Sequence, residues 1–225
     1  MSGFLLERRR RWRHKRLDDC PLRDYLAAPF PRPGLDYREV EYVAVDLETT
    51  GLDSRRDQIL SIGWVRLDGD RIRLETARHR VVHVDGDIPA ESAVIHQIMD
   101  DEAAGGLPLA DVLPELLQDL SGRVLIAHHA RIELGFIGAA CKRLWGKRLL
   151  VRTVDTQTVA RRLLDRRQIP YRGSDLRLHS LCERYNLPRH GAHNALSDAL
   201  AAAELFLAQA AHRDSGHGMV LADFL

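Results

Sequence analysis

The sequence has no long apolar run and few cysteines. Its longest unbroken apolar stretches, such as residues 199–203, are far shorter than the roughly 20 residues that a membrane-spanning helix needs. The three cysteines, Cys20, Cys141 and Cys182, form no CxxC pair, which favours reduced thiols over a disulfide framework or a zinc ribbon. Only residues 4–6 are apolar before the first basic run, so the order of a secretory signal is missing. We therefore expect an unprocessed cytoplasmic protein without membrane contact.

Charge is balanced over the whole chain but not along it. The 225 residues are 45% hydrophobic and 29% charged with a net charge of +1, which is typical of one globular domain with a sizeable core. Residues 1–17 contain seven Lys or Arg and one Glu, so an arm of net charge +6 precedes a body of −5. This arm is either an electrostatic tether to nucleic acid or another anionic surface, or a solvated terminus, and the sequence leaves both open.

The hydrophobic pattern predicts an α/β fold with a mixed sheet flanked by helices. Predicted strands are 42–48, 58–67, 71–74, 80–84 and 124–127, with a hairpin turn at Asp68 and Gly69, and predicted helices are 109–120, 133–144, 156–164, 176–185 and 194–211. The proline-rich segment 29–34 indicates a boundary. We predict a basic arm and linker over 1–39, a compact domain over 40–212 and a tail over 213–225.

Two acidic residues mark the end of the first predicted strand. Asp46 and Glu48 are two residues apart, so the period of a strand places both carboxylates on one face. Neighbouring carboxylates repel each other, and a hard divalent cation between them removes the repulsion. Two solvated acids at a strand end are the simpler alternative, which this pair alone does not exclude.

Two other polar groups lie where predicted helices begin. His193 precedes Asp198 by five residues, so a base and a carboxylate are able to face one point. Glu133 lies in the first turns of a helix, shortly after His128 and His129. A charge that stabilises a helix terminus explains Asp198 or Glu133 equally well when each is taken alone.

Together, in this order, these motifs resemble the DEDDh (DnaQ-like) 3′–5′ exonucleases, which include the proofreading epsilon subunit of bacterial DNA polymerase III. The resemblance runs from about residue 43 to about residue 207 and implies a ribonuclease H-like fold. Its first motif is Asp46-Leu-Glu48-Thr-Thr-Gly-Leu52, followed by residues 57–63, and segment 88–96 is similar to the family's stretch ending in isoleucine and histidine. The last motif, His193 with Asp198, matches the histidine subtype rather than the tyrosine subtype.

The resemblance also implies roles for single residues. Two Mg²⁺ or Mn²⁺ ions per site would be held by Asp46, Glu48, Glu133 and Asp198. His193 would be the base that deprotonates the attacking water, a role that suits its unperturbed pKa. The implied substrate contacts are Thr49, Leu52 and His128.

One motif departs from the family pattern. The family has asparagine, phenylalanine and aspartate where this chain has His129, Ile132 and Glu133. Glu133 keeps the charge but is one methylene longer, which leaves three outcomes open: ordinary activity, an altered metal preference or a weakened catalyst. We favour an active enzyme, because the other four catalytic positions match the family.

The sequence thus predicts a metal-dependent 3′–5′ exonuclease that acts on single-stranded or frayed DNA and releases nucleoside 5′-monophosphates. DNA is favoured over RNA as the substrate, and a DNA polymerase is the expected protein partner. One alternative is an exoribonuclease or short-oligonucleotide hydrolase on the same scaffold. The other is a catalytically weak, nucleic-acid-binding subunit associated with a polymerase, for which the arginine arm would be the main contact.

Overall fold

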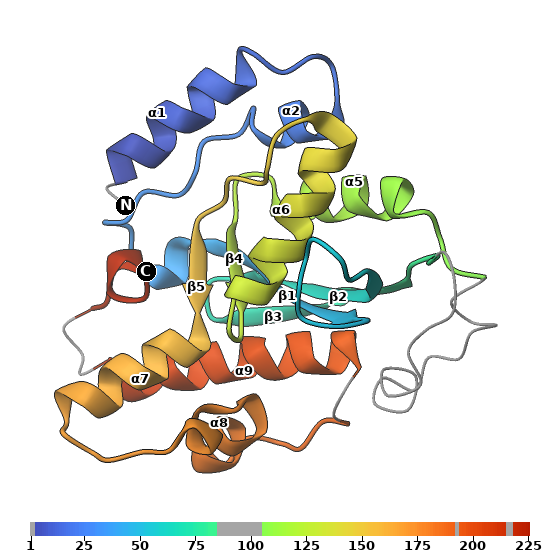
Figure 1. The fold of residues 1–225 in the computed structure, drawn as a ribbon. Coiled ribbons are helices and arrows are strands. Elements are labelled where there is room, and N and C mark those ends of the chain that lie inside the picture. The colour runs from blue at the N-terminus through green and yellow to red at the C-terminus, as the bar shows by residue number, and fades with distance from the viewer. Residues whose placement is uncertain (1–2, 85–104, 192–193, 215–217) are drawn as a thin grey trace.

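The computed structural model describes residues 3–84, 105–191, 194–214 and 218–225, and its centre is a five-stranded sheet in the order β3-β2-β1-β4-β5 (Figure 1). The strands are β1 (Glu41–Thr49), β2 (Ile59–Asp68), β3 (Arg71–Val81), β4 (Val124–Ala127) and β5 (Thr153–Asp155). The first three strands are antiparallel, whereas β4 runs parallel to β1 and β5 runs parallel to β4. The sheet is therefore mixed, as predicted.

Helices cover both faces of this sheet (Figure 1). The helices are α1 (Gly3–His14), α2 (Pro21–Tyr25), α5 (Leu109–Leu120), α6 (Arg131–Trp145), α7 (Thr156–Arg166), α8 (Leu178–Arg184) and α9 (Ala195–Arg213), with short 3₁₀ turns at Tyr37–Glu39, Gly173–Leu176 and Leu221–Asp223. One face packs against α2, α5 and α6, and the other packs against α7 and α9. The ribonuclease H-like architecture that the sequence predicts is confirmed. None of the described helices combines the length and apolar composition that crossing a bilayer requires.

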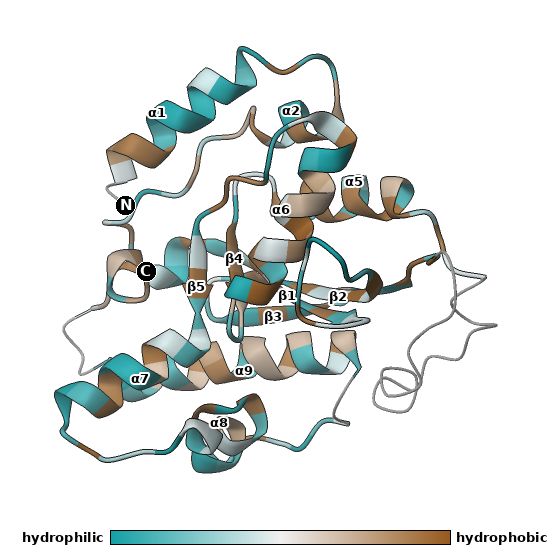
Figure 2. Cartoon of the chain, in the orientation of Figure 1, coloured by the Kyte–Doolittle hydropathy of each residue, from teal (hydrophilic) through white to brown (hydrophobic). Residues whose placement is uncertain are grey.

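Alternation along β1 divides the core into two layers. Val43, Val45 and Leu47 are buried on the α5 and α6 side, whereas Tyr42 and Ala44 are buried on the α9 side. In Figure 2, brown segments mark hydrophobic residues in the strands and in the helices beside the sheet. Since side chains two residues apart share a face, Asp46 and Glu48 continue the α9 side of the strand.

The hairpin between β2 and β3 forms where it was predicted. Gly69 has a φ of +60°, and a Cβ there would lie 2.0 Å from the carbonyl oxygen of Arg38. Only glycine suits both the left-handed backbone and this close approach. The two strands predicted over 71–74 and 80–84 are one continuous strand, β3, with a register shift opposite Trp64 and Arg66.

The two ends of the chain pack against the same core as the central part. Leu6 of α1 and Leu22 of α2 join the cluster on the α6 side, while Leu221 and Phe224 join the cluster on the α9 side. A solvated terminus therefore does not describe the arm, which forms a helix with one buried side. The division at residues 39 and 212 stays a prediction, although side chains on both sides of each boundary share one core.

Candidate functional site

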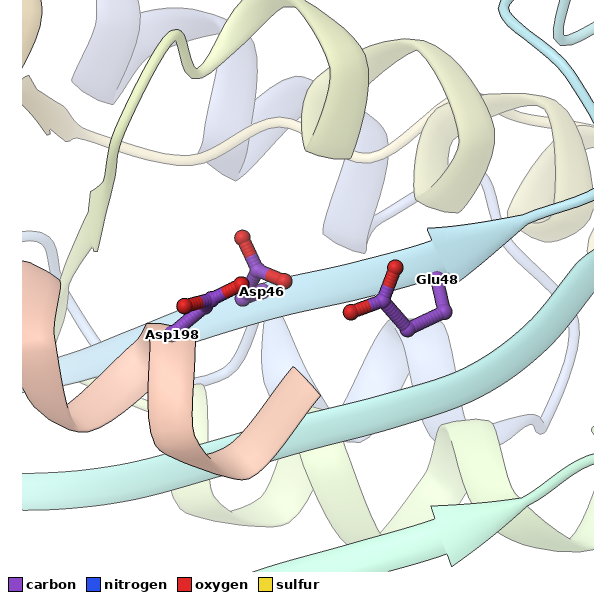
Figure 3. A group of neighbouring side chains, drawn as sticks. All are labelled: Asp46, Glu48 and Asp198. Carbon is purple, nitrogen blue, oxygen red and sulfur yellow. The ribbon is translucent and has the colours of Figure 1, made fainter. Parts of the chain in front are cut away.

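Three carboxylates meet where β1 extends beyond β4. Pairing between these strands ends at Ala44 and Ile126. Beyond Ala44, the edge of β1 that faces β4 is therefore no longer paired with that strand. One carboxylate oxygen from each of Asp46, Glu48 and Asp198 lies within 4.8 Å of the others. Figure 3 shows Asp46 and Glu48 along β1 with Asp198 reaching them from the first turns of α9. The strand period and the helix position predicted from sequence therefore converge on one site.

Gly63 explains how α9 comes so close to the sheet. It is the β2 partner of Asp46, and a Cβ on it would lie 2.1 Å from the carbonyl carbon of Ala195 and the nitrogen of Leu196. The helix begins directly over this glycine, and the side chain of Asn194 caps it by accepting a hydrogen bond from the Ser197 nitrogen at 3.1 Å. Any larger residue at position 63 would push the helix, and Asp198 with it, away from Asp46.

Ionisation of these carboxylates is unfavourable when no cation is present. Burial raises the pKa of Asp46 well above its ordinary value, and the charges of Glu133, Asp198 and Glu48 raise it further. Glu48 itself is only 5% exposed. Clustered carboxylates in a partly dry site are costly unless protons or cations neutralise them.

Glu133 of α6 places a fourth carboxylate near this cluster, where its charge acts on Asp46. It is 3% exposed, and its Oε2 has no hydrogen-bond partner among the described residues. Burial raises its pKa from 4.5 to about 8, and the nearby charge of Asp155 adds to the effect. Oxygen ligands of this kind are the ones that Mg²⁺ and Mn²⁺ prefer, so the cluster of Asp46, Glu48 and Asp198 fits a divalent-cation site. Metal binding by Glu133 stays a prediction.

The connection from β4 into α6 is held by the last residue of β5. Asp155, which caps α7, accepts hydrogen bonds from the backbone nitrogens of Gln157 and His129, at 3.0 and 3.1 Å. His129 stands where the family has asparagine, and its φ of +63° is a conformation that asparagine and histidine adopt more readily than most residues. The sequence analysis missed Asp155, although an Asp-Thr pair before a helical pattern is a typical cap.

His128 is fixed within the protein. Its Nε2 donates to the carbonyl oxygen of Leu176 at 3.0 Å, and its Nδ1 lies 2.9 Å from the Thr156 hydroxyl. Burial lowers the pKa of His128 to about 4, so the ring is neutral near pH 7. The predicted contact between His128 and substrate stays a prediction.

The turn after β1 presents one apolar side chain to solvent. Thr49 is buried and donates its hydroxyl hydrogen to the Gly51 carbonyl at 2.7 Å, whereas Leu52 is 80% exposed. A Cβ on Gly51 would lie 2.5 Å from Asp57 Oδ2, which also accepts a hydrogen bond from the Asp53 nitrogen at 2.7 Å. The turn is therefore tightly organised and leaves Leu52 exposed to solvent. The substrate contacts of Thr49 and Leu52 stay predictions.

Two predicted motifs lie outside the described residues: His193, and the segment 88–96. A histidine outside all the predicted motifs, His179, lies near the site. The Nε2 of His179 is 3.9 Å from Asp198 Oδ1, and its side chain is 49% exposed. Its distance from Asp198 in the sequence concealed this contact.

Comparison with known proteins identifies the family. The model of the exonuclease family (RNase_T) matches residues 43–206, a span that contains all three carboxylates. The chain belongs to this exonuclease family. It is 30% identical over 188 residues to the DNA polymerase III subunit epsilon of Treponema pallidum, covering 80% of this chain and 82% of that protein. It is also 30% identical over 171 residues to the PolC-type DNA polymerase III of Thermotoga maritima, of which it covers only 12%.

Solved exonuclease structures share the fold. Exonuclease X in complex with 5′ overhanging duplex DNA superimposes with a TM-score of 0.60 at 21% identity, over 81% of this chain and 96% of that one. Escherichia coli exonuclease I in complex with an oligonucleotide gives 0.67 at 14% identity, over 83% of this chain and 43% of that one. The resemblance to DEDDh (DnaQ-like) exonucleases is confirmed, and the chain is a nuclease of that group.

Proposed function

We propose that this exonuclease removes nucleotides from the 3′ end of single-stranded or frayed DNA in a reaction that depends on Mg²⁺ or Mn²⁺. The products are nucleoside 5′-monophosphates. The observation that carries the proposal is the convergence of the Asp46, Glu48 and Asp198 oxygens within 4.8 Å at the open end of β1.

The acidic residues form the metal-binding part of the proposed site. Asp46, Glu48, Asp198 and Glu133 would hold two ions, and the pKa values raised by burial and mutual repulsion are the physical reason that they require cations. Bound divalent cations supply positive charge that stabilises the phosphate in the transition state and make water a better acid. The methylene that Glu133 adds relative to the family's aspartate is the feature expected to alter the preference between Mg²⁺ and Mn²⁺.

The other residues bind and orient the reactants. We assign His193 as the base that takes the proton from the attacking water, because it stands five residues before Asp198 as in the histidine subtype. Exposed Leu52 would pack against the terminal base, and the Thr49 turn would hold the last nucleotide through its backbone. His128 would be a third substrate contact, and its bonds to Thr156 and Leu176 fix the orientation of its ring.

The preference for DNA and the protein partner rest on the relatives. The Treponema pallidum relative is named as a subunit of DNA polymerase III, and exonuclease X was solved with DNA. On the same ground we propose a DNA polymerase as the partner. A cytoplasmic location agrees with the free thiols of Cys20, Cys141 and Cys182.

Degradation of end-labelled strands tests the proposal. Single-stranded DNA and RNA of one sequence, each labelled at the 5′ end, are incubated with the protein in Mg²⁺, in Mn²⁺ and in chelator. We expect a ladder that shortens from the 3′ end with either metal, faster shortening of DNA than of RNA, and no cleavage in chelator. Chromatography of the products should show 5′-monophosphates.

Asp46→Asn is the matched test of the site. Loss of one metal-binding charge should lower the rate by at least about 10³-fold, while relief of repulsion keeps the protein folded. Asp70→Asn, at an exposed turn, is the control with the same chemical change and should leave the rate unaltered. Full activity of Asp46→Asn, or cleavage of the strand by the wild-type protein in chelator, would contradict the proposed site.

A further inference from the structure

Helix α1 is anchored to the protein although half of its residues are charged. Arg10 is 7% exposed, pairs with Glu7 at 2.7 Å and donates to the carbonyl oxygens of Leu26 and Ala27. Leu6 packs into the core beside it. A charged side chain this deeply buried must be fully hydrogen-bonded, and these bonds determine which side of α1 faces inward.

The outer side of α1 is basic. Arg9, Trp12 and Arg13 have the spacing i, i+3 and i+4, which places them on one face of the helix, and Arg16 lies in the turn that follows it. The guanidinium of Arg16 lies 4.5 Å from the centre of the Trp12 ring, and Trp12 is 49% exposed. Residues 8–17 contain no acid, and the acids of the next turn begin at Asp18.

The end of α6 adds a second group of cations at the same place. Arg13 Nη1 donates to the carbonyl oxygen of Arg148 at 2.7 Å, so α1 contacts the segment that follows α6. The exposed cations there are Lys142, Arg143, Lys147 and Arg148. Residues 134–149 contain no acid. A helix dipole explains one or two cations in a last turn, fewer than these two ends have together.

The outer face of α6 connects this surface to the carboxylate site. Exposed Arg131 begins the helix next to the site, and Arg148 at the far end folds back to donate to the Gly135 carbonyl at 3.2 Å. Under Arg148 the helix carries Gly138, where a Cβ would lie 3.3 Å from Arg148 Nε. Except for buried Glu133, every charged residue from Arg131 to Arg148 is basic.

We infer that α1 and the end of α6 form a second nucleic-acid-binding surface, which holds the phosphate backbone of the strand upstream of the terminus being removed. This basic surface consists of Arg9, Trp12, Arg13, Arg16, Lys142, Arg143, Lys147 and Arg148. The position of the strand terminus rests on the proposed function, whereas binding to the surface does not. The 15 residues of α6 span about 22 Å, which is about six nucleotides at the 3.4 Å rise of a fully stacked strand and fewer for an extended one.

Binding in chelator tests the surface without cleavage. The affinity of a fluorescent 20-nucleotide DNA strand is measured by anisotropy for wild type, for Arg16→Gln/Lys147→Gln, and for Arg71→Gln/Arg78→Gln. The second pair removes the same charge from exposed positions on β3 and serves as the control. Loss of two phosphate contacts should weaken binding about tenfold near 0.15 M salt and reduce the slope of log K against log salt by about 1.4. The control pair should bind as wild type does.

Substrate length gives a second measurement. In Mg²⁺, the ratio of kcat/KM for a 20-nucleotide strand to that for a 4-nucleotide strand should fall about tenfold in Arg16→Gln/Lys147→Gln, because the short strand does not reach the basic surface. Fluorescence of wild type should be quenched by the long strand more than that of Trp12→Phe, which lacks the exposed indole. Melting temperatures verify that all variants are folded.

The outcomes separate this inference from the proposed function. Equal affinity of the two paired variants, or binding to anionic vesicles without binding to DNA, would overturn the basic surface even if the enzyme cleaves DNA. A tenfold difference between the pairs in chelator would support the surface even if no strand is shortened, a result that contradicts only the exonuclease proposal.

Discussion

The two ends of α6 differ in both the sign and the exposure of their charge. At the first turn, Glu133 is an acid that is 3% exposed and lies next to other acids. At the last turn and just beyond it, Lys142, Arg143, Lys147 and Arg148 are exposed cations. The first end has charge that burial makes costly, and the second has charge that water already stabilises.

This difference separates two kinds of binding site. Buried acids demand a partner in the folded protein itself, and a small cation is the one that fits between carboxylates. Exposed cations need no partner for folding, so their accumulation without acids is suited to a large external anion. One helix thus connects a proposed catalytic site, where position is decisive, to a proposed docking surface, where charge is decisive.

After Asp46→Asn, the largest effect is expected when the carboxylate site keeps its acids but loses its geometry. In Gly63→Ala, the added methyl would overlap the backbone of Ala195 and Leu196, where a Cβ would lie 2.1 Å away. Displacement of α9 should reduce exonuclease activity at least 100-fold and destabilise the fold by about 1–3 kcal/mol. Activity assays and urea unfolding measure both. Gly173→Ala, where a Cβ meets nothing within 4 Å, is the control. An active, stable Gly63→Ala would show that α9 does not depend on this contact.

A smaller effect is expected from removing the buried charge of Glu133. Since folding raises the pKa of this carboxyl from 4.5 to about 8, its contribution to stability is complete below pH 4.5 and is lost as the pH rises through 8. Metal-free Glu133→Gln should therefore melt at least about 3 °C higher than wild type at pH 8 and nearly the same at pH 4.5. Scanning calorimetry in chelator measures this. Added Mn²⁺ should stabilise wild type more than the variant, and parallel pH profiles of the two proteins would contradict the prediction.

Removal of the exposed Leu52 side chain should affect the reaction with substrate but not the stability of the fold. Leu52→Ala removes a side chain that is 80% exposed, so the melting temperature should not change. If Leu52 packs against the terminal base, kcat/KM should fall about tenfold. Leu74→Ala, at an exposed position on β3, is the control. Unchanged kinetics of Leu52→Ala would remove this residue from the substrate site.

The smallest effect belongs to single cations at the basic end. Lys142→Gln should weaken DNA binding about fourfold near 0.15 M salt and lower the salt slope by about 0.7, with no change in stability. Anisotropy at several salt concentrations measures this. If the slope stays the same, Lys142 lies outside the contact surface.

Sequence reasoning succeeded where local patterns are strong. Helix 109–120 and strand 124–127 match α5 and β4 in their limits, because the helix has a clear apolar period and the strand is an unbroken apolar run between Arg123 and His128. It missed β5, whose three residues are too few for a period to show. It also missed α1 as a helix, because the residue that turns inward beside Leu6 is Arg10, a side chain that hides the amphipathic pattern.

The sequence by itself determined that Asp46 and Glu48 share a face of β1, that α9 starts just before Asp198, and which family the motifs resemble. Tertiary structure alone decided that Gly63 admits α9 to the sheet, that burial raises the pKa of Glu133, and that α1 meets the end of α6. Strand period and helix caps act over a few neighbouring residues, so they are visible in the sequence. Contacts such as that between Arg13 and Arg148 join segments 135 residues apart, and only the packing of the whole chain brings these together.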